Sequence, residues 1–406
     1  MWHSRSRLCR SKHRQECLCH TRQEAGAVIS SRSSVGLYVH VPFCARKCAY
    51  CDFNSYAGMD ELIEPYVRAL QWEMEQRSPE VGRVPTIYIG GGTPSHLPEG
   101  RLENVLCQVF QVFDVDRDAE VTVEANPADL DIRRMRALRN AGVNRVSIGA
   151  QSFDDGALRF LGRRHDASQA RQAVEIARAA RFENVSIDLI YALPAQSPEE
   201  WRGTLEEAIA LSPDHISAYS LTIERGTPLG DLVERGLVAP LDNDTEAEMY
   251  EIARGMLEAG GYEHYEISNF ARAGFSCRHN QNYWRNGDYL GVGAGAHSYL
   301  NGVRWWNVKH PEEYVRMARG GALPVAGAER LSRHEQAMES LVLALRTREG
   351  VVVEALEQRF GRELWQSHRN RIMGAVENGP LCIRDGRLAL VREAFVIADA
   401  VCEALV

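Results

Sequence analysis

The sequence lacks several features that would place the chain in a familiar class. No run of 18 apolar residues occurs, so no transmembrane helix is expected, and no apolar stretch near the start has the form of a secretory signal. Basic residues are not in excess, since 47 Lys and Arg stand against 55 Asp and Glu, which argues against nucleic acid as a partner. Cysteine is sparse, at ten in 406 residues, so a disulfide scaffold is not expected.

Residues 1–34 differ in composition from the rest of the chain. Arginines are scattered among serines with only two glutamates, and no apolar core segment is present. We interpret this segment as a disordered tail or as the product of a wrongly assigned start codon. An organellar transit segment is the alternative. The expected location is the cytoplasm, or an organellar matrix if the segment is a transit signal.

From residue 36 onwards, short apolar, β-branched runs alternate with segments of helical periodicity. This alternation predicts parallel strands joined by right-handed helical crossovers. Over residues 35–308 we expect an α/β fold in which six strand–helix units form a sheet that curves into a barrel of the TIM type, or most of one, although the periodicity itself does not separate this from a flat sheet. A flat doubly wound sheet is the alternative. The expected strands are 36–43, 86–92, 120–126, 145–151, 184–194 and 215–223, and the expected helices are 61–76, 98–112, 128–140, 167–180 and 198–211.

After about residue 225 the pattern changes. Residues 309–406 are expected to form a C-terminal domain whose helices and single hairpin predict a small winged-helix-like module. The dipeptide Asp385-Gly386 predicts the turn of that hairpin. The elements expected in this half are a helix at 243–260, a strand within 262–271, an aromatic, glycine-rich stretch to 308, a helix and linker over 309–330, and the hairpin at 382–390.

Three of the cysteines are clustered as Cys44-x3-Cys48-x2-Cys51, directly after the first expected strand. Thiolates at this spacing indicate a metal site in a reducing compartment. Structural zinc is the less favoured interpretation, because it needs four ligands and no fourth cysteine lies nearby. A four-iron, four-sulfur (4Fe-4S) cluster held by three cysteines keeps one iron open for another ligand. We therefore predict a 4Fe-4S cluster whose open iron chelates the amino and carboxylate groups of a small molecule.

Polar residues recur where the expected strands end. The stretch GGGTPS at 90–95 ends the second strand, and glycine lets backbone N–H groups approach a ligand closely. It is not a phosphate-binding P-loop, because no Gly-Lys-Ser/Thr follows. Glu124 and Gln151 end the third and fourth strands, and Asp188 lies within the fifth. Since ligand sites of barrels lie at the C-terminal ends of the strands, we expect these residues near the cysteines.

Together these motifs resemble a known family. Residues 38–44 (YVHVPFC), the cysteine triad and GGGTPS are similar to the oxygen-independent coproporphyrinogen III oxidase-like branch of the radical S-adenosylmethionine (SAM) superfamily, over about residues 36–406. The resemblance implies a partial (βα)6 radical SAM barrel with a C-terminal helical domain, a 4Fe-4S cluster and bound SAM. It also implies cofactor contacts for Tyr38, Tyr50, Gly91, Gly92, Thr93 and Glu124, and contacts to a second SAM molecule for Gln151, Arg163 and Asp188.

Two features distinguish subgroups within this family. The oxidases carry another cysteine two positions after the third one, where this chain has Phe53. The chain instead carries His-Asn-x-x-Tyr-Trp at 279–284, which resembles the haem chaperones of the HemW type. This resemblance implies haem as a further cofactor, an acceptor protein for the haem, and a reductant for the cluster. The residues implied in haem contact are His279, Asn280, Tyr283 and Trp284, with Arg278 and Arg285 placed to pair with propionates.

The motif at 279–284 leaves alternatives open. A histidine in such a position is often a hydrogen-bonded structural residue, and Cys277 is a soft alternative iron ligand. The sequence allows two functions, haem chaperone and oxidative decarboxylation of coproporphyrinogen III. Phe53 favours the chaperone, because a cysteine at that position is typical of the oxidases.

Overall fold

The computed structural model describes residues 34–405, so the tail predicted for residues 1–34 lies almost wholly outside the described part of the chain. The main element is a mixed sheet of twelve strands in the order β14-β13-β12-β11-β1-β4-β5-β6-β7-β8-β10-β9. A separate three-stranded sheet, in the order β15-β17-β16, belongs to the C-terminal part. The α/β class predicted from the sequence is confirmed.

The centre of the large sheet consists of the six predicted strands, in chain order. Each pairs in parallel with the next, as expected for right-handed βα units. The five predicted helices lie between them, within a few residues of the expected bounds. The elements are β1 Gly36–Val41, α1 Ile63–Arg77, β4 Arg83–Gly91, α2 Arg101–Val112, β5 Asp114–Ala125, α3 Ile132–Asn140, β6 Arg145–Gln151, α5 Ala167–Ala179, β7 Asn184–Tyr191, α6 Pro198–Ala210 and β8 His215–Ser220.

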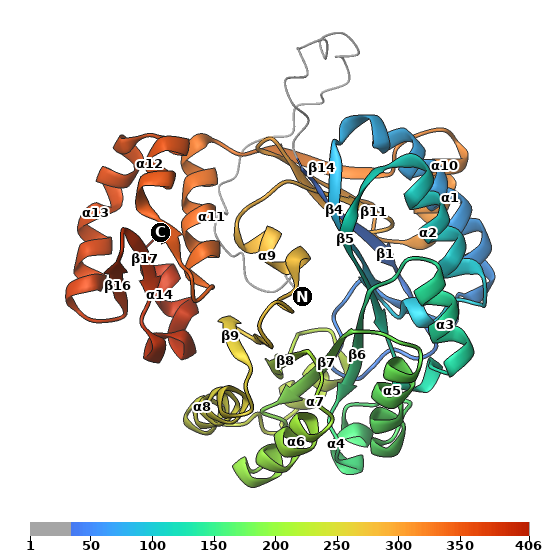
Figure 1. The fold of residues 1–406 in the computed structure, drawn as a ribbon, viewed down its shortest axis with the longest axis horizontal. Helices are drawn as coiled ribbons and strands as arrows, with labels where there is room; N and C mark the ends of the chain where they lie inside the picture. Colours follow the sequence, from blue (N-terminus) through green and yellow to red (C-terminus); the bar gives the residue numbers. More distant parts are fainter. Residues whose placement is uncertain (1–33, 406) are drawn as a thin grey trace.

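In Figure 1 the strands follow a curved arc, with the helices from α1 to α6 along its outer side. The C-terminal part faces the open, inner side, and helix α9 (Arg278–Trp284) lies between the two. The inner side of the arc is therefore where residues from many strands and from α9 can meet.

The parallel strands have two chemically different faces. In β4, Ile87 and Ile89 are fully buried in the apolar core, whereas Thr86 and Tyr88 on the opposite face make side-chain hydrogen bonds. Successive side chains of a strand point to opposite faces, so this alternation separates an apolar outer face from a polar inner face. Polar residues on the inner face are unusual for a barrel-type fold, whose interior is normally filled by branched apolar side chains.

The later part of the sheet contains elements that the sequence did not predict. Strand β11 (Tyr289–Val292) pairs in parallel with β1, and the antiparallel strands β12 (His297–Leu300), β13 (Val303–Asn307) and β14 (Val325–Arg330) extend that edge. The stretch over 325–330 was predicted as a linker, which is wrong. A Cβ on Gly327 of this strand would lie 2.5 Å from the Trp306 ring. The glycine therefore allows close strand packing.

Other elements complete the inner edge and the C-terminal part. The helix predicted at 243–260 is α8, and the strand predicted within 262–271 is a pair of short antiparallel strands, β9 and β10. The predicted hairpin is confirmed, with Asp385 and Gly386 at φ of 51° and 73°. The bounds are α4 Asp155–Phe160, α7 Pro228–Glu234, α8 Asn243–Ala259, β9 Glu263–Glu266, β10 Asn269–Ala271, α10 Pro311–Arg319, α11 Arg333–Leu345, β15 Val351–Val352, α12 Val353–Phe360, α13 Arg362–Glu377, β16 Leu381–Arg384, β17 Arg387–Leu390 and α14 Ala398–Leu405.

A buried carboxylate joins α1, α10 and the edge of the sheet. Glu73 accepts hydrogen bonds from Tyr314 Oη at 2.5 Å, Asn307 Nδ2 at 2.7 Å and the Gly293 amide at 2.8 Å. Burial raises the pKa of Glu73, while these hydrogen bonds favour the charged form.

Within residues 34–405, no helix is long and apolar enough to cross a membrane.

Removing the Glu73 carboxylate should destabilise the fold. We expect Glu73→Ala to lower the free energy of unfolding by about 3 kcal/mol, because buried donors on three other segments lose their acceptor. Chemical denaturation followed by circular dichroism measures the change. The control is Glu75→Ala, an exposed position of the same helix, with an expected change within about 0.5 kcal/mol. Equal, small effects of the two variants would contradict this role for Glu73.

Candidate functional site

Cys44 ends the short strand β2 (Phe43–Cys44), just beyond the C-terminal end of β1. Cys48 and Cys51 lie on the loop that leads from β2 to β3 (Tyr56–Ala57). Cys44 is buried, whereas Cys48 and Cys51 are partly exposed. The amide of Thr93, after β4, donates to the Phe43 carbonyl and fastens the loop to the next strand. The position at the C-terminal end of parallel strands is the one the sequence predicted for a ligand site.

The thiols have neighbours that suit a metal cluster. Thr93 Oγ1 lies 3.3 Å from Cys44 Sγ, and Arg163 Nη1 donates to Cys48 Sγ at 3.4 Å. Hydrogen bonds and positive charge at thiolate sulfurs tune and stabilise iron–sulfur clusters. Burial raises the pKa of the Cys44 and Cys51 thiols, so deprotonation would accompany metal binding.

The donor set of three free thiols suits a cluster better than a single ion. Among residues 34–405, no group of three or more His, Cys, Asp or Glu side chains could hold a single metal ion. A 4Fe-4S cubane presents its irons at separate corners, so its ligands need not converge on one point. The residues therefore fit the predicted cluster, with Arg163 as a counter-charge beside Cys48.

The glycine turn after β4 lies against Glu124. The Gly91 amide donates to Glu124 Oε2 at 3.0 Å, and Tyr88 Oη donates to Oε1 at 2.8 Å. A Cβ on Gly90 would lie 2.8 Å from this carboxylate, and one on Gly92 would lie 2.8 Å from the Phe43 carbonyl oxygen. Only glycine leaves this cradle open, and its backbone N–H groups and the carboxylate suit the polar end of an amino-acid ligand.

Two tyrosines lie near this region, Tyr38 close to Glu124 and Tyr50 close to Arg163 and Cys48. Tyr38 Oη lies 2.9 Å from His40 Nδ1, and its ring stacks on Tyr88 with the ring centroids 6.3 Å apart. Tyr50 packs against the small apolar cluster of Leu161 and Leu193. Burial raises the pKa of both tyrosines, so both stay neutral and act as hydrogen-bonding or stacking groups.

Gln151, Arg163 and Asp188 come from the neighbouring strands β6 and β7 and the segment after α4. Gln151 has a φ of 68°, which is sparsely populated for a residue with a side chain. Arg163 Nη2 donates to the Gly149 carbonyl at 2.7 Å. Asp188 accepts from Ser147 Oγ at 3.1 Å, and burial raises its pKa. The structure thus brings these polar residues to the same side of the sheet as Glu124.

His279 is held inside the molecule by its motif neighbours. It is 1% exposed, its Nδ1 lies 2.9 Å from Thr86 Oγ1, and its Nε2 lies 2.9 Å from Tyr283 Oη. Burial, with a smaller effect of Arg145, lowers the pKa of His279 to about 3, so the imidazole is neutral. Both ring nitrogens are therefore engaged in hydrogen bonds. Asn280 and Trp284 are partly exposed on α9.

Two inner-face residues were missed in the sequence. Glu120 accepts from the amides of Arg278 and His279 at 3.0 and 3.1 Å and so caps the start of α9. Arg145 is 2% exposed, and its charge partly offsets the burial that raises the pKa of Asp188. The alternation of side chains along a strand could have identified both residues, because positions an even number apart share one face. Glu120 thus shares a face with Glu124, and Arg145 shares one with Ser147, the hydrogen-bond partner of Asp188.

Comparison with protein families agrees with this geometry. Residues 38–208 match the model of the radical SAM superfamily, and residues 331–397 match the HemN C-terminal domain. Among solved structures, coproporphyrinogen III oxidase (HemN) from Escherichia coli aligns with a TM-score of 0.81, covering 92% of this chain and 90% of that chain at 22% identity. The fold and the cysteine site thus define a radical SAM protein with a HemN-type C-terminal domain.

Curated relatives place the chain within one group of that class. Heme chaperone HemW of Mycobacterium tuberculosis is 38% identical over 91% of this chain and 94% of its own length. HemW of Bacillus subtilis is 38% identical over 80% and 87%, and HemW of Escherichia coli is 41% identical over 70% and 76%. The chain belongs to the HemW family of heme chaperones.

Gly91 should not tolerate a side chain. Its φ is 113°, and a Cβ would lie 2.3 Å from the His40 ring. We expect Gly91→Ala to lower the free energy of unfolding by about 2 kcal/mol, measured by chemical denaturation. The matched control is Gly203→Ala in α6, where a Cβ meets nothing within 4 Å and helix propensity predicts a gain of up to about 1 kcal/mol. A Gly91→Ala protein as stable as the wild type would contradict the proposed crowding.

Proposed function

We propose that this chain is a haem chaperone that binds haem and delivers it to an acceptor protein. Membership of the HemW family is the observation that carries the proposal. We further propose a 4Fe-4S cluster on Cys44, Cys48 and Cys51, with SAM exchangeable at the open iron. An external reductant would set the redox state of the cluster. We place the protein in the cytoplasm.

The proposed SAM contacts follow the geometry of the glycine turn. Gly91, Gly92 and Thr93 would receive the amino-acid end of SAM, and Glu124 would accept a hydrogen bond from its amino group. Tyr38 and Tyr50 would exclude water around the cluster and cofactor. The support is that Glu124 already binds the Gly91 amide and that no Cβ fills the cradle. When bound, cluster and SAM supply one-electron chemistry.

Gln151, Arg163 and Asp188 are the proposed contacts for a second SAM molecule. Arg163 also lies at Cys48, so it has a role at the cluster whether one or two SAM molecules bind. Asp188 would hold a donor of the ligand, since its carboxylate is buried and already accepts from Ser147.

For haem, the proposed contact segment is α9, with His279, Asn280, Tyr283 and Trp284. The four residues of this helix fall into two groups. His279 and Tyr283 fasten α9 to the sheet, while Asn280 and Trp284 are partly exposed. Direct ligation of iron by His279 would require Tyr283 or Thr86 to release a ring nitrogen. Cys277 is a less suitable ligand, because burial raises its pKa to about 12 and disfavours the thiolate.

Two finer statements on the fold belong to the same proposal. We interpret the curved sheet of Figure 1 as a partial (βα)6 radical SAM barrel, supported by six parallel strands in chain order. We interpret the C-terminal domain as winged-helix-like, supported by the order α11, β15, α12, α13, β16 and β17. We propose a packing role for this domain rather than DNA binding.

The alternative function is oxidative decarboxylation of coproporphyrinogen III. The observation that favours it is the presence of Gln151, Arg163 and Asp188 around one side of the sheet, as the resemblance to the oxidases implied. Phe53 argues against it, because the oxidase pattern has a cysteine at that position.

Loss of one cluster cysteine should abolish the cluster. We expect Cys48→Ser, after anaerobic reconstitution, to contain less than about a tenth of the wild-type iron and labile sulfide and to lack the brown absorbance. A serine oxygen is a poor replacement for a soft thiolate ligand. The control is Cys107→Ser, an exposed cysteine of α2, which should reconstitute like the wild type. Zinc in place of iron and sulfide in the wild type would overturn the cluster.

Haem binding and decarboxylation can be separated in one preparation. We expect the reconstituted wild type to bind haem stoichiometrically, measured by the Soret absorbance, and to produce no protoporphyrinogen from coproporphyrinogen III with SAM and reductant. Substantial protoporphyrinogen would overturn the chaperone function in favour of the oxidase. Absence of saturable haem binding would remove it without supporting the oxidase.

A further inference from the structure

The exposed part of the cysteine loop carries positive charge that no acid neutralises. Arg46 and Lys47, between the first two cysteines, are both exposed. Arg46 donates to the Gly162 carbonyl at 2.6 Å, and Lys47 donates to the Phe53 carbonyl at 3.0 Å. Neither cation has an ion pair within the described part of the chain. Because carbonyl groups are neutral, these hydrogen bonds fix the two side chains in place and leave their charge available.

A third cation, Lys309, lies beside the same loop. Its backbone carbonyl accepts hydrogen bonds from Asn54 Nδ2 at 3.0 Å and Tyr56 Oη at 3.3 Å, so the chain between β13 and α10 packs against the loop. Its side chain is exposed, without an ion pair among residues 34–405. Those residues contain two lysines, Lys47 and Lys309, while every other strongly basic residue is arginine. Both lysines therefore lie at the cysteine loop.

Lysine suits a contact that forms and breaks quickly. An ammonium group is a compact, strongly hydrated charge on a flexible stem, whereas a guanidinium makes planar, two-point contacts with carboxylates. Exposed charges of this kind raise the rate at which an oppositely charged protein arrives, and they contribute little to how long it stays. Fast, weak encounters with small interfaces are typical of electron-transfer partners.

The positive charge at the loop contrasts with the rest of the chain. We call Arg46, Lys47 and Lys309 the loop cations. Asp52 is the exposed acid on the loop itself, so three cations stand against one carboxylate. The whole chain has a formal net charge of −8. An acidic partner is therefore repelled by the molecule in general and attracted to this place, which orients the encounter.

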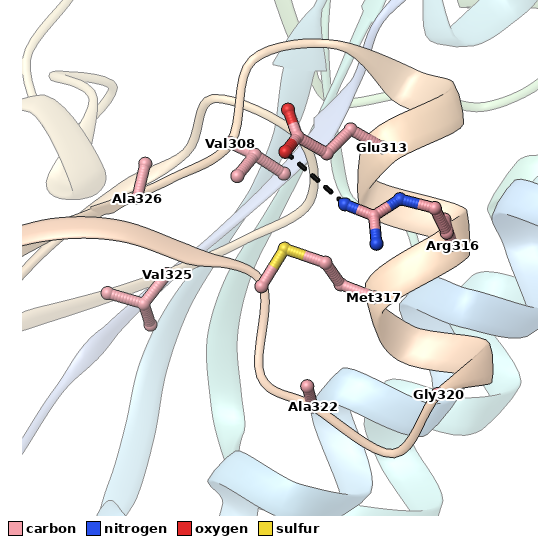
Figure 2. Close-up of a pocket in the computed structure, with 8 residues that line it drawn as sticks. All are labelled: Val308, Glu313, Arg316, Met317, Gly320, Ala322, Val325 and Ala326. Carbon is pink, nitrogen blue, oxygen red and sulfur yellow. Dashed lines mark hydrogen bonds and ion pairs between the residues drawn. The ribbon is translucent and has the colours of Figure 1, made fainter. Parts of the chain in front are cut away.

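A neighbouring cleft of about 600 Å³, between α10 and β14, does not share this charge (Figure 2). Its lining includes Val308, the residue before Lys309, and is largely aliphatic. Its two charged residues, Glu313 and Arg316, point toward one another in Figure 2 and pair at 3.5 Å. The unpaired positive charge of this region therefore belongs to the loop cations and not to the cleft.

We propose that the loop cations are the docking surface for an acidic protein that donates single electrons to the cluster. This inference rests on the proposed function, which includes the cluster and an external reductant. One electron leaves the reduced donor and is taken up by the oxidised cluster, and no bond is made or broken. Electron transfer slows steeply with distance, so the donor must dock where the cysteines come near the surface. Cys48 and Cys51 are the partly exposed ones, and Arg46 and Lys47 adjoin them in the chain.

The test uses a plant-type ferredoxin as an acidic one-electron donor to the reconstituted protein. We expect Lys309→Glu to slow reduction of the cluster about fivefold at low salt and Lys47→Gln about twofold, followed by stopped-flow bleaching of the cluster absorbance. Both effects should shrink at high salt, because exposed charges are then screened. Lys309 bonds to the loop only through its backbone carbonyl, so its substitution changes charge and keeps those hydrogen bonds.

The matched control is Arg202→Glu, which makes the same change of charge at an exposed position of α6 and should behave like the wild type. Dithionite, a small reductant that needs no docking surface, should reduce all variants at the same rate, which shows that their clusters are intact. Binding is measured separately, by fluorescence anisotropy of labelled, oxidised ferredoxin. We expect the affinity to fall about fivefold in Lys309→Glu and to stay unchanged in Arg202→Glu.

The outcomes separate this surface from the proposed function. If both lysine variants bind ferredoxin and accept electrons like the control, or if salt does not affect the wild type, the docking surface is overturned while the proposed function stands. Binding of phosphatidylserine vesicles without binding of ferredoxin would assign the loop cations to a membrane surface and overturn it too. A wild type that holds no iron and sulfide after reconstitution would remove the proposed cluster, and the docking surface with it.

Discussion

The alternation of polar and apolar side chains along the parallel strands is the constraint on which the rest of the structure depends. The apolar positions pack against the outer helices and form the core, which frees the opposite face for polar groups. Each of these polar groups is close to another strand, as in Tyr88 to Glu124 and Ser147 to Asp188. Buried polar groups of this kind are costly unless they are hydrogen-bonded, so the inner face is a network in which each residue depends on its neighbours.

The same constraint explains what the sequence could predict. The six strands and five helices follow from periodicity, and the cysteine loop and Glu124 follow from their place at strand ends. The capping of α9 by Glu120 could not be predicted, because the partners are more than 150 positions apart in the chain and only the tertiary fold brings them together. Strand β14 was not predicted, because a glycine such as Gly327 weakens the sequence signal for a strand. In the fold, the same glycine allows close contact with the Trp306 ring.

His279 shows that a motif can be recognised in a sequence while the surroundings of its residues cannot. The motif forms helix α9, which lies between the sheet and the C-terminal part (Figure 1). Its histidine, however, satisfies both ring nitrogens within the protein, which the sequence could present only as the structural alternative. Residue type alone does not show which face of a seven-residue helix meets the sheet. That choice is made by Thr86 and Glu120, which bind the helix from strands β4 and β5.

A continuous set of contacts joins the glycine turn to helix α9. Gly91 binds Glu124, Glu124 binds Tyr88, and Tyr88 stacks on His279 with ring centroids 5.4 Å apart. Tyr88 is therefore shared by two parts of the network, the turn through Glu124 and the helix through His279. Because each buried polar group depends on its neighbours, a substitution at Tyr88 would disturb the glycine turn and helix α9 together.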